Sequence, residues 1–226
     1  MLPPANYGYT TTESTSPTRY VVGLDLGQAQ DFTAIAVLAH RHHTVDCQMQ
    51  GRTVTKLHEV QHLSRFRLGT SYPDIVDAVG RMMKSLPASP LAPVLLTDAT
   101  GVGRPVIDLL RKSGLKPIAV TITGGSEETS SGDFDHRIPK KNIVSSLQVA
   151  LQSERLKIAR GLPDTDNLIN ELQNFKMKVL ASGHESFEAW RESIHDDLVL
   201  ATGLATWFCE RGYDGMKQTY VDYMSR

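Results

Sequence analysis

The chain has 226 residues, of which 40% are hydrophobic and 22% are charged, and its formal net charge at pH 7 is −1. These values fit one large α/β domain or two small ones, and no apolar run approaches the ~18 residues of a transmembrane helix, so a transmembrane helix is excluded. The small net charge argues against a protein that holds nucleic acid by bulk electrostatics alone. A carboxylate cluster that binds cations would, however, lower the formal charge in the same way.

We expect residues 1–18 to be a flexible leader, because they are rich in Pro, Ser, Thr and Tyr and lack the basic and apolar regions of a secretory signal. Residues 19–226 should then form a single domain. Cys47 and Cys209 match no metal-ligand spacing and no disulfide framework. We therefore expect reduced thiols and a cytoplasmic protein, located in the host-cell cytoplasm if the protein is viral.

The domain begins with strand patterns. Runs rich in β-formers at 19–26 and 32–38 flank a polar turn at 27–31, and a third run at 53–60 alternates more openly, as expected near a sheet edge. Three strands before any helix predict an antiparallel meander.

Helical and strand patterns alternate in the middle of the chain. Apolar spacing predicts helices at 74–86 and 105–112, and short apolar runs predict strands at 94–97 and 117–122. This β-α-β order predicts parallel neighbours joined by right-handed crossovers.

The last part of the chain is expected to be mainly helical. We expect a polar loop at 123–137, helices at 139–153, 164–175 and 195–209, a short strand near 155–160, and a hairpin built from 176–181 and 186–191. Together the patterns predict an α/β domain with a mixed sheet, an antiparallel meander plus parallel strands, flanked by helices on both faces.

Two acidic residues stand at the ends of apolar strands. Asp25 closes the first strand and Asp98 follows the run VLLT. The ends of adjacent strands are where α/β folds place reactive groups, so the two carboxylates are expected to converge. Close carboxylates repel each other, and a divalent cation removes that conflict; oxygen ligands suit Mg²⁺ or Mn²⁺.

A third acidic group comes from His195-Asp196-Asp197 at the start of the last predicted helix. Successive helical residues diverge by about 100°, so both aspartates cannot point into one site. Asp197 lies one turn before Ala201 on the apolar face, which favours Asp197 over Asp196.

Each of these residues also fits an ordinary structural role. A lone aspartate after a strand is commonly a turn former or helix cap, the role that we assign to Asp31, and His195 fits a general base, a metal ligand or a cap-region histidine. The glycine-rich segment 98–103 is interpreted as a tight turn, because the chain contains no Gly-Lys-Ser or Gly-Lys-Thr of a P-loop. The sequence shows no Ser-His-Asp or Cys-His nucleophile pattern. Only the three acids together predict a metal site.

Basic residues cluster around the predicted loop and the helix that follows it. Arg137, Lys140 and Lys141 are the best candidates for contacts with DNA phosphates, since they adjoin a loop and a helix N-terminus. They also fit ordinary solvated charges.

Four segments resemble, in their order along the chain, the nuclease domain of phage large terminase subunits, the DNA-packaging enzymes of the RNase H-like superfamily. The segments are VVGLDLGQAQDFTAIAVL, LLTDATGVGRPVIDLL, IPKKNIVSSLQVALQSERLKI and ESIHDDLVLATGLA, and they run from Val21 to Ala205. The last segment, an acidic pair after histidine that leads into an Ala-rich helix, is the most specific. The first is less so, because strands of the GLDLG type also open sugar kinases and chaperone ATPases.

The resemblance implies an RNase H-like fold and cleavage of double-stranded DNA by two-metal-ion hydrolysis with Mg²⁺ or Mn²⁺. By position, Asp25 corresponds to the shared first-strand ligand, Asp98 to the second acid and Asp197 to the helix acid, with Asp196 adjacent. A full large terminase carries an ATPase motor, which this sequence lacks. We therefore expect an excised domain, a prophage remnant or a protein that works with a separate packaging ATPase, with a small terminase subunit or a portal as further expected partners.

Three alternatives remain open from the residues alone. Another RNase H-like nuclease, such as a Holliday junction resolvase, shares the same arrangement of acids. A nucleotide-binding protein of the sugar kinase type needs two such lobes, and this chain offers one. A non-catalytic DNA-binding or assembly module would not need the acids.

Overall fold

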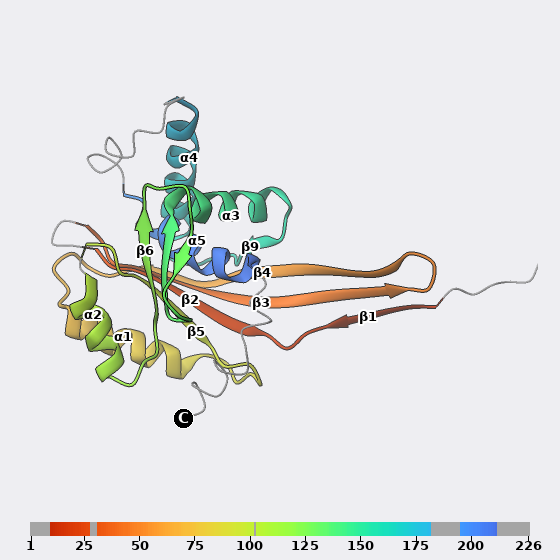
Figure 1. Ribbon diagram of the computed structural model, residues 1–226, viewed down its shortest axis with the longest axis horizontal. Coiled ribbons are helices and arrows are strands. Elements are labelled where there is room, and N and C mark those ends of the chain that lie inside the picture. Colours follow the sequence, from red (N-terminus) through yellow and green to blue (C-terminus); the bar gives the residue numbers. More distant parts are fainter. Residues whose placement is uncertain (1–9, 28–30, 102, 182–194, 212–226) are drawn as a thin grey trace, which may run out of the picture.

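The computed structural model describes residues 10–27, 31–101, 103–181 and 195–211 (Figure 1). Its strands form one nine-stranded sheet in the order β7-β8-β6-β5-β2-β3-β4-β9, and β1 pairs with β3 beside this path. The strands are β1 (Thr11–Thr15), β2 (Arg19–Asp25), β3 (Ala34–Cys47), β4 (Gly51–Arg65), β5 (Val94–Asp98), β6 (Ile118–Thr123), β7 (Thr129–Ser130), β8 (Asp135–Pro139) and β9 (Leu156–Ile158). The helices are α1 (Tyr72–Ser85), α2 (Gly103–Lys112), α3 (Lys140–Gln152), α4 (Thr165–Ala181) and α5 (Asp197–Glu210).

The predicted antiparallel meander is confirmed as β2-β3-β4. Strands β3 and β4 are much longer than predicted and extend as a hairpin beyond the helices, with β1 alongside (Figure 1). The outer half of this hairpin is only partly buried and polar, so it lacks the apolar run by which a strand is recognised. Strand β4 does not lie at the edge as expected, because β9 pairs with it in parallel.

Two further expectations are corrected on the N-terminal and β6 sides of the sheet. Thr11–Thr15, expected to belong to a flexible leader, form β1 and pair with β3. The predicted polar loop at 123–137 is wrong, because it contains β7 and most of β8. Strand β8 pairs in parallel with β6, which supplies a backbone ladder that the polar sequence of this segment does not signal.

The helices cover both faces of the sheet, as predicted. Helices α1 and α2 lie on one face, and α3, α4 and α5 lie on the other (Figure 1). Alternation along β2 places Val22 and Leu24 in the core under α1 and α2, and Val21 in the core under α5. By the same alternation Asp25 lies on the α5 face, the face on which the acidic site is built.

The described part of α4 corrects the predicted hairpin. Residues 176–181, expected to form its first strand, continue α4, whereas 186–191 lie outside the described residues. Among the residues that the structure describes, no helix is long and apolar enough to cross a membrane.

Candidate metal centre

Asp25 and Asp98 lie side by side at the ends of two parallel strands. In the register of β2 and β5, Leu24 is opposite Thr97, so the next residue of each strand is one of the two acids. Both side chains are buried, and each carboxyl group affects the pKa of the other. This contact is the convergence of strand-end acids that the sequence predicted.

The surroundings of the two acids affect their pKa values differently. Burial raises the pKa of Asp25 well above its ordinary value, and the negative charge of Asp98 raises it further. Burial also raises the pKa of Asp98, but Thr100 offsets this effect by donating its backbone N–H to Oδ1 at 2.8 Å. The interaction between the two carboxyl groups raises the pKa of Asp25 and lowers that of Asp98.

Asp197 is the first residue of α5 and is 6% exposed. Its charge raises the pKa of Asp25, which places it within electrostatic reach of the pair. Burial raises the pKa of Asp197 itself to about 6, an effect reduced by Arg65, whose Nη2 lies 3.5 Å from Oδ2. This buried Oδ2 has no hydrogen-bond partner among the described residues.

Asp196 points to a different neighbour. Lys140, the first residue of α3, donates to Oδ2 of Asp196 at 2.6 Å. The charge of Lys140 also lowers the pKa of Asp98. The lysine predicted to contact DNA is therefore held within the acidic cluster. Of the other two candidates, Arg137 lies exposed on β8 and Lys141 is half-buried.

His195 lies at the rim of the cluster. Its Nδ1 is 3.8 Å from Oδ2 of Asp197, and about half of its side chain (51%) is exposed. Its ring meets that of Phe32 edge to face at 5.0 Å, and the guanidinium of Arg65 lies over the same Phe32 ring at 4.8 Å. The imidazole is thus close to an acid and also open to a ligand arriving from solvent.

The sequence reasoning missed Arg65 and Glu171. Arg65 ends β4 and forms ion pairs with both Glu171 and Asp197. Glu171 accepts the backbone N–H of Val199 at 3.0 Å, which satisfies a donor in the first turn of α5. Glu171 follows the buried Leu168 by three residues, so its position on the buried face of α4 was a usable signal.

Burial raises the pKa of Glu171 to about 7, and the charge of Arg65 counteracts this rise. Glu171 and Arg65 together hold the start of α5, and with it Asp197, against the ends of the central strands.

Comparison with known proteins identifies the fold. No family model and no curated protein matches the chain. The solved large terminase nuclease of the thermophilic phage G20c matches with a TM-score of 0.52 and 18% identity, over 83% of this chain and 81% of that one. The terminase nuclease domain of human cytomegalovirus, solved after soaking in Mn, matches with a TM-score of 0.50 and 13% identity, over 85% and 84%. This chain has the terminase nuclease fold.

The donor set in this terminase nuclease fold suits a hard divalent cation. Asp25, Asp98 and Asp197 offer only carboxylate oxygens, which Mg²⁺ and Mn²⁺ prefer. Two local features favour a cation: the burial of Asp25 beside Asp98, whose charge raises the pKa of Asp25, and the buried Oδ2 of Asp197 that lacks a hydrogen bond. The residues present therefore fit the metal ions that the sequence predicted.

Proposed function

We propose that this chain is a metal-dependent endonuclease that cleaves double-stranded DNA and acts in viral DNA packaging. The observation that carries this proposal is the adjacent Asp25–Asp98 pair, buried at the strand ends on the face where α5 begins with Asp197. Burial of several acids in one place is costly unless cations neutralise them. The terminase nuclease fold gives this acidic site its functional context.

The three acids are proposed to hold two Mg²⁺ or Mn²⁺ ions, with Asp25 shared and Asp98 and Asp197 completing the two sites. When bound, such a pair of ions activates a water for in-line attack on phosphorus and stabilises the leaving 3′ oxygen. The cytomegalovirus domain with this fold was solved after an Mn soak, which supports the choice of metal.

The chain's own residues prepare and surround this site. Asp25 must be ionised to act as a ligand, and a bound cation favours that form. Arg65 and Glu171 orient Asp197 by fixing the first turn of α5. His195, beside Asp197 at the exposed rim, is positioned to accept a proton at its imidazole as general base.

The substrate backbone is proposed to lie along Arg137, Lys140 and Lys141. Lys140 is anchored by Asp196, which holds its amino group next to the acids, where a phosphate would arrive. Arg137 is exposed on the neighbouring β8. In packaging, the partners would be a separate ATPase motor, a small terminase subunit or a portal.

Plasmid nicking tests the proposal. With Mn²⁺ or Mg²⁺, the purified chain is expected to nick and linearise supercoiled DNA with little sequence preference. Asp25→Asn, Asp98→Asn and Asp197→Asn should each abolish cleavage while the far-UV spectrum and melting temperature remain those of a folded protein. The matched control is Asp77→Asn, an exposed aspartate on α1.

Cleavage in excess chelator, or unchanged cleavage by Asp25→Asn, would overturn the proposal. Preferential cleavage of four-way junctions over linear duplex would replace the packaging nuclease with a junction resolvase.

A further inference from the structure

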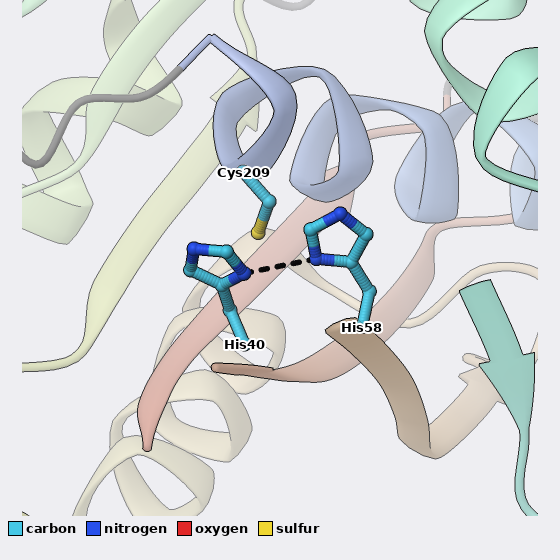
Figure 2. A group of neighbouring side chains, drawn as sticks. All are labelled: His40, His58 and Cys209. Atoms are coloured by element: carbon cyan, nitrogen blue, oxygen red, sulfur yellow. Dashed lines mark hydrogen bonds between the residues drawn. The ribbon is translucent and has the colours of Figure 1, made fainter. Parts of the chain in front are cut away.

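A second group of potential metal ligands lies far from the acids. His40 on β3, His58 on β4 and Cys209 on α5 are all buried, and one ligand atom from each lies within 4.8 Å of the others. Figure 2 shows the sulfur of Cys209 pointing from the helix toward the two imidazoles, whose Nδ1 atoms are 2.9 Å apart. We propose that these three side chains bind one zinc ion.

The location separates this cluster from the nuclease site. His40 and His58 are directly opposite each other in the β3–β4 register, near the start of β2 rather than at its Asp25 end. Asp197 begins α5 and Cys209 is its penultimate residue. At 1.5 Å per residue the helix spans roughly 18 Å between them, so one ion cannot serve both groups.

The hydrogen bond between His58 and Glu210 determines which ring nitrogen of His58 is available to a metal. Nε2 of His58 lies 2.6 Å from Oε1 of Glu210, so Nε2 carries the proton and donates it to the carboxylate. In the neutral ring, Nδ1 then presents its lone pair toward His40 and Cys209. A carboxylate behind the distal nitrogen is the usual support of a metal-bound histidine.

Glu210 is itself held in place from two sides. Nη1 of Arg155 donates to its Oε2 at 2.6 Å, and Nζ of Lys56 donates to its backbone oxygen at 2.5 Å. These contacts fix the residue that follows Cys209 and thereby the end of α5. The cluster is therefore supported by ion pairs and is not a chance approach of three flexible side chains.

Burial acts on the two imidazoles in the same direction. Burial and, to a lesser extent, the neighbouring His58 lower the pKa of His40 to about 3. Burial lowers the pKa of His58 as well, although Glu210 counteracts this effect.

The ligand types select zinc over the ions of the acidic site. A thiolate with two imidazoles suits Zn²⁺, whereas Mg²⁺ and Mn²⁺ prefer oxygen. With Zn–N bonds of about 2.0 Å, tetrahedral geometry separates two nitrogens by roughly 3.3 Å, so the rings need to part by only a few tenths of an ångström. Water would take the fourth position. The ion would tie the base of the long β3–β4 hairpin to the end of α5.

Metal analysis tests the proposal on the whole chain. After dialysis against chelator and reconstitution with Zn²⁺, the wild-type chain should retain one zinc per molecule, and so should the Asp25→Asn/Asp98→Asn double variant. Zinc retention is thus measured independently of nuclease activity. His40→Ala and Cys209→Ser should lose the ion, whereas Cys47→Ser, the other cysteine variant, should keep it.

Cobalt spectroscopy identifies the ligands directly. Co²⁺ bound to wild type and to Cys47→Ser should give a thiolate-to-metal charge-transfer band that Cys209→Ser lacks. Zinc should raise the melting temperature of wild type and Cys47→Ser by about 5 °C or more and leave that of Cys209→Ser unchanged. If Cys209→Ser does not fold, the wild-type spectrum and the His40→Ala variant carry the test.

Three results would overturn the proposal. The first is wild-type protein that retains no zinc. The second is zinc that is lost from the Asp25→Asn/Asp98→Asn variant but kept by Cys209→Ser. The third is a cobalt complex without a thiolate-to-metal charge-transfer band. The last two would leave His40 and His58 joined simply by a hydrogen bond.

Discussion

Gly23 of β2 and Ala201 of α5 approach so closely that a Cβ on Gly23 would lie 1.9 Å from the backbone oxygen of Ala201. The obstructing atom belongs to a helix backbone, so it cannot move aside as a side-chain tip can. This contact lets the α5 backbone pack directly against β2, the strand that ends in Asp25. The residue that begins α5 is Asp197, so the same contact sets the distance between the two acids.

Gly23→Ala is therefore expected to lower the free energy of unfolding by about 3 kcal/mol or more. It should also remove metal-dependent nicking, because α5 is displaced. The control is Gly80→Ala in α1, where an added Cβ meets nothing within 4 Å and should stabilise the helix by roughly 0.5–1 kcal/mol. Urea unfolding measures the change in the free energy of unfolding for both variants. Equal stability of the two variants would mean that α5 does not depend on this contact.

The pH dependence of folding should report on Glu171. Burial raises its pKa from 4.5 to about 7, so the folded state binds the proton more tightly than the unfolded state. The resulting stability is fully present below pH 4.5 and is lost as the pH rises through 7. Between about pH 5 and pH 8 this loss amounts to about 2 kcal/mol. Glu171→Gln, which keeps an acceptor for Val199, should remove this part of the pH dependence.

Urea unfolding across this pH range checks the expectation. Glu154→Gln, at an exposed position, should follow the wild-type profile. Glu171→Ala, which removes the acceptor, should be less stable than Glu171→Gln at every pH. Parallel wild-type and Glu171→Gln profiles would show that Glu171 does not change its protonation over this range.

The sequence predicted the elements that bear the acids because their signals are local. The strands ending at Asp25 and Asp98 are apolar runs, and the helix beginning at Asp197 is largely apolar and is buried from Asp197 to Cys209. The long β3–β4 hairpin was underestimated because its outer half is polar, and strand pairing rather than burial maintains it. Strand β8 was missed for the same reason, since its ladder partner β6 is not visible in its own sequence.

Side-chain clusters that depend on the tertiary fold were not predictable in this way. Arg65 reaches Glu171 across 106 positions of the chain. His40 and His58 are 18 positions apart, a spacing set by the length of a hairpin and not by any metal-binding motif. Cys209 joins them only because α5 lies across both strands. The spacing of residues within one segment therefore could not reveal the Arg65–Glu171 ion pair or the cluster of His40, His58 and Cys209.

The two aspartates before α5 should differ sharply on substitution. Asp197→Asn is expected to lower the rate of plasmid nicking by more than about 100-fold, because it removes a proposed ligand. Asp196→Asn should cost about 10-fold or less, since Asp196 acts through its ion pair with Lys140. Initial nicking rates at saturating Mn²⁺ separate the two. The reverse order would transfer the ligand role to Asp196.

His195 can be tested as a base separately from metal binding. Its Nδ1 lies 3.8 Å from Asp197 and its ring is half exposed, which suits a group that meets water at the rim of the site. His195→Ala should therefore lower kcat by about 100-fold while the Mn²⁺ concentration for half-maximal activity stays unchanged. The control is His43→Ala on the distant hairpin, which should match wild type in both quantities. A large rise in the Mn²⁺ requirement of His195→Ala would instead make His195 a ligand, because only loss of a donor weakens the binding of the ion itself.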